Sequence, residues 1–542
     1  MFEMSGGDEA QLLNDTSRIK GKEALFRNIE AADALSEAIK STLGPKGLDK
    51  MLVSDNGSVK ITNDGVTVLK NAKIEHPIAK MLIDIAINQE NTVQDGTTTS
   101  VLLASELLQN AWELYVKGIH PSIIVNGYSL AYNKCNELIE KFAIKITEDN
   151  LLESATKTSL SGIGGLKLQD TLTRLTCKAA KGISISQNSG ITANPNNVKI
   201  ISQKGGVATD SYLVEGLVLA KQACSPDMKR NHEEGTILII DGGIEKRKTT
   251  IQSKINFSDP SMISAFRDKE LELISKQIEN IIQLKPTIVV CREGIDDAAI
   301  RLLEKSGITA YRRVERNDFE LLSRACSASI VASPMSAKKS DLGIFCESYE
   351  ENWAGVVHWI LKGTKQSGVT LVIRGSSEQL IQEIEISFSD ALAVACQIIE
   401  NGKVLSGGGA TQMALSRTLK EWSQEFEGRE SLAILAYADA LEIIPRTLAI
   451  NAGLDPIDQI LALNAAQASA KSGLSSKLGI NIHNSTISNM YDLGVIETIQ
   501  NHKQCLAGST SAAISILRID DVLWAKNDPT IPEGIGEEED HE

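Results

Sequence analysis

Apolar residues recur at helical spacing in two stretches near the start of the chain. The first includes Leu25, Ile29, Ala32, Leu35, Ile39 and Leu43, and it stops at the helix-breaking run Gly44-Pro45-Lys46-Gly47. The second begins after Asp95-Gly96-Thr97-Thr98-Thr99 and includes Val101, Leu102, Leu107, Leu108, Ala111, Leu114 and Tyr115. Between the stretches, two short apolar segments flank Asp55-Asn56-Gly57, which predicts a hairpin of 51–53 with 59–62.

The start of the second predicted helix has the chemistry of a nucleotide site. The first N–H groups of a helix have no intrahelical partner and therefore favour an anion. Asp95 could hold a Mg²⁺ ion while the hydroxyls of Thr97, Thr98 and Thr99 take phosphate oxygens. Helix capping explains the same residues, because Asp and Thr are common at helix starts. For this cluster alone, capping is the simpler interpretation.

Comparable turns occur far away in the sequence. The predicted hairpin ends in Thr62-Asn63-Asp64-Gly65, and Gly407-Gly408-Gly409 separates two helical patterns, the first of which carries Asp390. In the middle of the chain, Thr236–Ile240 and Thr287–Cys291 are apolar runs that indicate buried strands alternating with helices, an α/β arrangement.

Four of these segments occur in an order and spacing that resembles the chaperonin family: Thr42-Leu43-Gly44-Pro45-Lys46-Gly47, Thr62-Asn63-Asp64-Gly65, Asp95-Gly96-Thr97-Thr98-Thr99 and Gly407-Gly408-Gly409-Ala410. Others resemble its group II branch, the archaeal thermosomes and the eukaryotic cytosolic chaperonin called CCT or TRiC: Leu371-Val372-Ile373-Arg374-Gly375, Asn451-Ala452-Gly453-Leu454-Asp455, Gly494-Val495-Ile496-Glu497 and Leu517-Arg518-Ile519-Asp520-Asp521. The similarity extends from about Arg18 to about Trp524.

Composition agrees with a large globular protein. A chain of 542 residues is too long for one core and is expected to form roughly three or four domains. A net charge of −15 argues against a nucleic-acid binder. The eight cysteines form no CxxC pair, which favours buried thiols over disulfides or a zinc site. No P-loop, no GxGxxG motif, no membrane-length apolar run and no signal peptide are found in the sequence, so the cytoplasm is the expected location.

The resemblance implies a multidomain chaperonin fold in which the chain passes out and back through three domains. A mainly α-helical equatorial domain would comprise residues 1–149 and 405–527, and a small mixed α/β intermediate domain would comprise 150–217 and 371–404. Residues 218–370 would form an α/β apical domain with a helical protrusion at about 254–281. The acidic tail, 528–542, is expected to be disordered.

The resemblance also implies the roles of individual residues toward ATP and Mg²⁺. Asp95 would be the metal ligand, and Asp64 and Asp390 would orient the attacking water. The residues expected to bind the nucleotide are Gly44, Gly96, Thr97, Thr98, Thr99, Ser161, Gly408 and Glu497. Because Asp390 belongs to another domain, hydrolysis would require the intermediate domain to close onto the nucleotide.

Two positions depart from the family pattern. Gln94 stands where relatives usually have glycine before the aspartate, so its side chain must point away or crowd the turn. Ile163 stands where relatives often carry a lysine that senses the γ-phosphate, and Lys167 is the nearest cation. The three aspartates are nevertheless all present, which favours an active ATPase.

The segment 254–281 distinguishes the branches of the family. Ser258-Asp259-Pro260 is a helix-start signal, and an apolar face follows: Met262, Ile263, Phe266, Leu273, Ile274, Ile278 and Ile281. We expect its second half to face the core and its first half to resemble the built-in lid of group II chaperonins. Near the tip, contacts with unfolded clients or neighbouring tips would come from Ile255, Phe257, Met262 and Phe266.

The sequence therefore predicts an ATP-hydrolysing chaperonin subunit that encloses unfolded or nascent polypeptides. It would work in a double ring of about eight or nine identical or homologous subunits per ring, without nucleic acid or membrane partners. Two alternatives remain at this point: a catalytically inactive chaperonin-like scaffold or assembly factor, suggested by Gln94 and Ile163, and a small-molecule ATP-dependent transferase.

Overall fold

The computed structural model describes residues 16–53, 57, 59–71, 76–146, 150–187, 190–245, 272, 274–353, 355–364, 368–470 and 473–525. The chain divides into two compact units. The first unit combines the two ends of the chain, Met1–Lys145 and Lys403–Glu542, and the second unit is the middle, Ile146–Gly402. The predicted equatorial domain, 1–149 and 405–527, differs from the first unit by a few residues where each segment meets the second unit.

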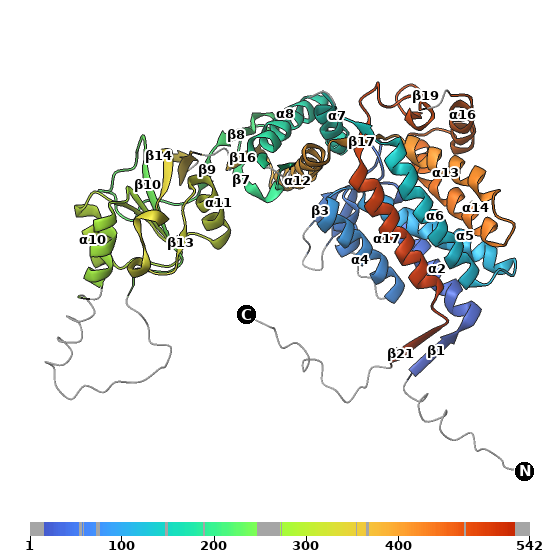
Figure 1. Ribbon diagram of the computed structural model, residues 1–542, viewed down its shortest axis with the longest axis horizontal. Helices are drawn as coiled ribbons and strands as arrows, with labels where there is room; N and C mark the ends of the chain where they lie inside the picture. The colour runs from blue at the N-terminus through green and yellow to red at the C-terminus, as the bar shows by residue number, and fades with distance from the viewer. Residues whose placement is uncertain are drawn as a thin grey trace, which may run out of the picture. The chain divides into compact units, whose positions relative to one another are not determined.

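The first unit is mainly helical. Its helices are α2 (Gly21–Lys40), α3 (Gly65–Asn71), α4 (Pro77–Val93), α5 (Thr97–Val116), α6 (Pro121–Phe142), α13 (Ala410–Ser423), α14 (Glu430–Leu441), α15 (Ile443–Asn451), α16 (Pro456–Ser469) and α17 (Ile499–Leu517). In Figure 1, α17 (red) runs alongside α4 (blue) and α6 (teal), and it packs on both as well as on α5. Helix α5 is apolar on nearly every face, so it lies inside the core rather than on its surface. The cluster Asp95-Gly96-Thr97-Thr98-Thr99 therefore lies at the start of a buried helix.

Short strand pairs complete this unit. They are β1 (Thr16–Lys20) with β21 (Asp521–Ala525), β2 (Lys50–Val53) with β3 (Val59–Thr62), β18 (Leu478–Asn481) with β19 (Thr486–Asn489), and a three-stranded sheet of β20 (Ile496–Thr498), β17 (Lys403–Ser406) and β4 (Ile144–Lys145). The predicted hairpin is confirmed as β2 and β3, in the register Met51 to Ile61. The predicted first helix is confirmed as α2, which ends at Lys40, before Leu43.

The second unit contains two larger sheets and is an α/β structure. One sheet has three strands in the order β7 (Val198–Lys204), β16 (Val369–Gly375), β8 (Tyr212–Glu215). The other sheet has seven strands, six of them in the order β12 (Thr309–Tyr311), β11 (Ile288–Cys291), β10 (Gly235–Ile240), β14 (Gly343–Trp353), β15 (Val356–Gly363), β9 (Leu217–Leu219). The seventh strand, β13 (Ile330–Val331), also pairs with β10. Strands β10, β11 and β12 are parallel, and the side chains of β11 are wholly buried, which confirms the predicted buried strands.

Helices cover both sheets of the second unit. Helices α7 (Asn150–Ser159), α8 (Leu166–Ile183) and α12 (Glu378–Asn401) pack on one another, and α8 and α12 also pack on β16. Helix α12 contacts the hairpin of β5 (Ile185–Gln187) and β6 (Gly190–Thr192) through β6. The seven-stranded sheet carries α10 (Asp297–Lys305), α11 (Arg316–Cys326) and a helix over 274–284. In Figure 1, α10 and α11 flank the strands β10 and β13.

The segment predicted as a protrusion lies partly outside the described residues. Its second half is a helix whose Ile274, Ile278 and Ile281 are buried in the core of the seven-stranded sheet, as expected. The proposed tip contacts Ile255, Phe257, Met262 and Phe266 lie outside the described residues, as does the acidic tail 528–542.

All eight cysteines are unpaired thiols, and six of them are buried. Among the helices in the described ranges, none is long and apolar enough to cross a membrane.

Candidate nucleotide site

The residues Asp95-Gly96-Thr97-Thr98-Thr99, which the sequence suggests as a nucleotide site, lie in the turn between α4 and α5 and in the first turn of α5. Gln94 ends α4 in a left-handed conformation, with φ of 57°, and its N–H donates to the Glu90 carbonyl at 2.9 Å. Gly96 is also left-handed, with φ of 76°, and is the N-cap of α5. A left-handed conformation costs a residue with a Cβ roughly 1 kcal/mol, which explains why glycine suits position 94 and why Gln94 is tolerated there.

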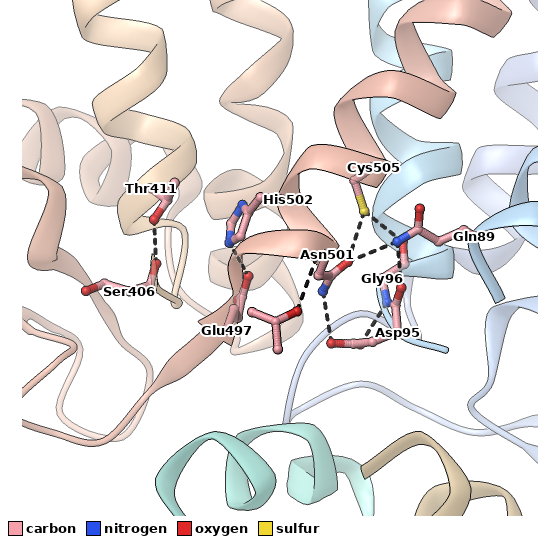
Figure 2. A network of polar contacts seen from close by, with 10 residues as sticks. Gln89, Asp95, Gly96, Ser406, Thr411, Glu497, Asn501, His502 and Cys505 are labelled. Atoms are coloured by element: carbon pink, nitrogen blue, oxygen red, sulfur yellow. Dashed lines mark hydrogen bonds and ion pairs between the residues drawn. The ribbon is translucent and has the colours of Figure 1, made fainter. Parts of the chain in front are cut away.

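Asp95, between these two residues, is not the helix cap. Its Oδ1 accepts from the N–H of Gly96 at 2.7 Å, and its Oδ2 accepts from Nδ2 of Asn501 in α17 at 2.9 Å (Figure 2). Neither oxygen accepts a hydrogen bond from an N–H group of the first turn of α5. The capping interpretation of Asp95 is therefore wrong, because the cap position belongs to Gly96.

The first turn of α5 leaves its N–H groups available. The first intrahelical bond runs from Ser100 N–H to the Gly96 carbonyl at 3.0 Å, and Gly96 has no side chain that could cap the turn. The N–H groups that precede this bond belong to Thr97, Thr98 and Thr99. Together with the helix dipole, they favour an anion at this end of α5.

Asp64 reaches the same region from the hairpin. Its two carboxylate oxygens accept from the N–H groups of Val66 and Thr67 at 3.3 and 2.8 Å, so Asp64 caps α3. The next residue, Gly65, lies against α5: a Cβ at this position would stand 2.5 Å from Thr98 Oγ1. The turn that carries Asp64 is thus in contact with the first turn of α5.

Carboxylates accumulate around this contact. Burial raises the pKa of Asp95 to about 6, with a further contribution from the negative charge of Glu497. Burial also raises the pKa of Glu90 to about 7; Asp64 adds to this effect and Lys70 opposes it. Such surroundings repel a bare polyphosphate and favour a divalent cation.

The oxygen ligands around Asp95 suit a Mg²⁺ ion that is also bound to the phosphates of a nucleotide. Within the ranges that the structure describes, no three or more His, Cys, Asp and Glu side chains converge to hold a metal by themselves. Mg²⁺ usually takes one or two carboxylates, waters and substrate phosphates, all oxygen ligands. Asp95 and the Thr hydroxyls beside it supply ligands of that kind.

The glycine turns meet on helix α15. A Cβ at Gly44 would lie 2.4 Å from Leu448 Cδ2, and a Cβ at Gly409 would lie 2.6 Å from Cβ of Pro445. Asn451, at the end of α15, donates Nδ2 to the carbonyls of Lys40 and Leu43, which fixes the turn that leads into Gly44. Two turns that are distant in sequence are thereby held by one short helix.

Glu497 lies next to Gly407, the first glycine of the same run. A Cβ at Gly407 would stand 2.8 Å from Glu497 Oε1, and Gly408, with φ of 62°, approaches the side chain of Met490. On the other side of Glu497, its Oε2 lies 2.7 Å from Nε2 of the buried His502 (Figure 2). A cavity of about 30 Å³, lined in part by Glu497 and Asn501, is large enough to hold a water molecule.

Two predicted site residues, Asp390 and Ser161, belong to the second unit, as do Ile163 and Lys167. Asp390 lies in α12, which packs against α7, α8 and the short 3₁₀ helix η1 (Leu160–Gly162). Ser161 lies within that 3₁₀ helix and is partly exposed, and the following Ile163 is also partly exposed. Lys167 is exposed in the first turn of α8.

Sequence reasoning missed Gln89, Glu90 and Asn501. Gln89 donates Nε2 to the Asp95 carbonyl at 2.7 Å, and Asn501 contacts the Asp95 carboxylate. The available signal was a polar side chain on the buried face of a helix: Asn501 precedes Cys505 by one helical turn, and both are buried.

Comparison with known proteins identifies the class to which this fold and site belong. A sequence model of the TCP-1/cpn60 chaperonin family matches residues 35–527, and the chain belongs to this family. Among curated relatives, it is 39% identical over 529 residues to the thermosome subunit of Methanopyrus kandleri, with 96% of each chain covered. It is 38% identical to the thermosome subunit alpha of Archaeoglobus fulgidus over the full length of both chains, and 37% identical to the thermosome subunit of Pyrococcus horikoshii over 97% of this chain and 95% of that one.

Membership establishes the general function. The chain is a group II chaperonin subunit, an ATPase that acts in ATP-dependent protein folding, and the family implies ring assembly and binding of polypeptides. The inactive-scaffold alternative is not favoured. A small-molecule transferase finds no support in a match of this length.

Proposed function

We propose that an ATP·Mg²⁺ complex binds at the first turn of α5 and that Asp95 is its metal ligand. One observation carries this proposal: the Asp95 carboxylate is held by Gly96 and Asn501 directly before a helix start whose N–H groups precede the first intrahelical bond. Thr97, Thr98 and Thr99 would receive the phosphates there, and Gly44 and Gly96 would let the backbone approach them. The bound metal would offset the negative charge of the triphosphate.

Two carboxylates would orient the attacking water. Asp64 stands beside Thr98 through the Gly65 contact, so it is close to where the phosphates would lie. Each carboxylate oxygen that caps α3 retains a lone pair that can accept from water. Asp390 would supply the second acceptor when the second unit closes, so that hydrolysis would follow closure.

The nucleoside would lie against Glu497 and Gly408. Glu497 is partly exposed and adjoins the Gly407 backbone, and its carboxylate can accept from ribose hydroxyls or a base amino group. Ser161 would approach the nucleotide from the second unit, beside Asp390. The departure at Ile163 removes a cation from that segment, so we expect the γ-phosphate to be sensed without it.

The domains would then act as a closing machine. The equatorial domain (1–149 and 405–527) would bind the nucleotide, the intermediate domain (150–217 and 371–404) would be the hinge, and the apical domain (218–370) would bind clients. The protrusion at 254–281 would be a built-in lid whose apolar tip contacts unfolded or nascent polypeptides. The assembly would be a cytoplasmic double ring of about eight or nine subunits per ring.

The decisive experiment joins assembly, hydrolysis and enclosure in one preparation. Electron micrographs of the purified protein should show double rings, and ATP turnover should stop in EDTA. Protease protection of a captured unfolded protein in the presence of ATP should be lost when Phe257 to Lys269 is replaced by a short Gly/Ser turn, while ATP turnover should persist. A trimmed protein that shields its client as well as the parent would exclude the built-in lid.

A further inference from the structure

Two buried amide side chains hold Asp95 from neighbouring helices. Gln89 in α4 is 1% exposed and Asn501 in α17 is 7% exposed. Gln89 Nε2 donates to the Asp95 carbonyl at 2.7 Å and to Asn501 Oδ1 at 3.0 Å, and Asn501 Nδ2 donates to Asp95 Oδ2 at 2.9 Å (Figure 2). One amide therefore holds the backbone of Asp95 and the other holds its carboxylate.

The chain of contacts fixes the orientation of each amide. A backbone carbonyl can only accept, so Gln89 must present its NH₂ group to Asp95. The same NH₂ group donates to Asn501, which must therefore present its oxygen, and the thiol of Cys505 donates to this oxygen as well at 3.3 Å. The NH₂ group of Asn501 is left to face Asp95. Reversing either amide would bring two donors or two acceptors together.

The two helices that carry the amides are fixed by a helix cap and by packing on each other. Thr498 caps α17 by accepting from the N–H of Asn501 at 3.2 Å, which fixes the start of the helix that carries the amide. Helix α17 packs along α4, the helix of Gln89. Asp95 itself lies between two left-handed residues, Gln94 and Gly96, in a turn that has no regular hydrogen-bonding pattern of its own.

From this geometry we infer that Gln89 and Asn501 are positioning residues of the magnesium–nucleotide site. They orient the Asp95 carboxylate so that its remaining lone pairs would be available to the cation. The inference rests on the proposed role of Asp95 as metal ligand. Removing a partner that orients a metal ligand typically weakens metal binding by roughly 10- to 100-fold.

Binding of ADP, measured by calorimetry in Mg²⁺ and in EDTA, tests this inference on the assembled protein. Asn501→Leu and Gln89→Leu should each lower the affinity in Mg²⁺ by roughly tenfold or more and leave the affinity in EDTA within about twofold. The double variant should lose little more than either single variant, because the two amides are bonded to each other and both position the same residue, Asp95. Ser509→Ala is the matched control: it deletes a buried polar group of α17 that donates to the Cys505 carbonyl and does not touch Asp95.

Unfolding midpoints of the same proteins without nucleotide separate positioning from stability. Lower midpoints with an unchanged ratio of the two affinities would show that the amides only hold the helices together, and would overturn the inference. Asn501→Ala, which leaves space for water, replaces Asn501→Leu if the larger side chain prevents assembly. Asp95→Ala is the reference: loss of the Mg²⁺ dependence there, with its retention in the amide variants, overturns the positioning role alone. A parent protein without any Mg²⁺ dependence overturns the proposed function too.

Discussion

Gly65, in the first turn of α3, packs directly against Thr98, in the first turn of α5. A Cβ on Gly65 would lie 2.5 Å from Thr98 Oγ1 and 3.4 Å from Thr97 Oγ1. The contact joins two of the motifs that were separate in the sequence, and it sets where Asp64 lies relative to the start of α5. A side chain at position 65 therefore requires either the Thr98 hydroxyl or the turn itself to move.

Gly65→Ala should therefore impair both stability and ATP turnover. Forcing a methyl group into a packed contact costs typically about 1–3 kcal/mol, and the displacement would separate Asp64 from Thr98. Thermal unfolding and steady-state hydrolysis measure the two effects. Gly428→Ala is the control, because the nearest atom to its added Cβ is the mobile carboxylate of Glu430. Equal turnover in both variants would show that this contact does not position the site.

Asp95→Ala should weaken binding of ATP in Mg²⁺ by roughly tenfold or more, because the metal loses its carboxylate ligand. In EDTA the affinity should be unchanged or slightly higher, since one negative charge is removed near the phosphates. Equilibrium binding under the two conditions gives the comparison. Asp84→Ala, at an exposed position of α4, should behave as the parent. The same Mg²⁺ dependence in Asp95→Ala would remove Asp95 from the site.

The regular elements near the site could be predicted because their signals are local. Apolar spacing identifies α2 and α5, and the turn residues identify the β2–β3 hairpin. The contact between Asn501 and Asp95 could not be predicted in this way, because 406 positions separate them and Asn501 belongs to none of the motifs. The position of the cap was also beyond the sequence, since Asp95 and Gly96 are both acceptable caps and only the backbone conformation distinguishes them.

The resemblance to the family carried what local patterns could not. It brought Gly44, Gly408 and Glu497 into one hypothesis, and the structure connects the glycine turns through α15 and places Glu497 beside Gly407. The resemblance implies glycine at the position of Gln94, and the structure gives a physical reason for that preference, because the backbone there is left-handed, with φ of 57°. For Asp390 and Ser161, which lie in the other unit, the assignment stays a prediction.

Glu90→Gln should stabilise the nucleotide-free protein above neutral pH. Burial and Asp64 raise the pKa of Glu90 from its ordinary 4.5 to about 7, so between these pH values the folded state binds more protons than the unfolded state. Stability therefore falls as pH rises through this window. Glutamine removes the penalty, and its unfolding midpoint at pH 8 should be higher by about 2 °C, the shift that roughly 1 kcal/mol gives in a large domain.

The advantage of Glu90→Gln should shrink as the pH falls through this window and vanish well below pH 4.5, where Glu90 is protonated in both states. Differential scanning fluorimetry in EDTA at several pH values follows the effect. Asp84→Asn, which neutralises an exposed carboxylate on the same helix, should show no such pH dependence. A constant difference between parent and Glu90→Gln at all pH values would mean that the carboxylate does not titrate in this range.

Asp390→Ala should retain ATP binding and lose hydrolysis. Apart from Ser161, the proposed ground-state contacts of the nucleotide come from the first unit, whereas Asp390 lies in α12 of the second unit and would act on the water. Loss of one water-orienting carboxylate typically slows hydrolysis by about 100-fold or more, while affinity should stay within about twofold. Single-turnover hydrolysis beside equilibrium binding measures both quantities. Glu385→Ala, an exposed position of the same helix, should hydrolyse ATP at the parental rate. Near-normal turnover in Asp390→Ala would show that closure of the second unit is not coupled to the chemistry through this residue.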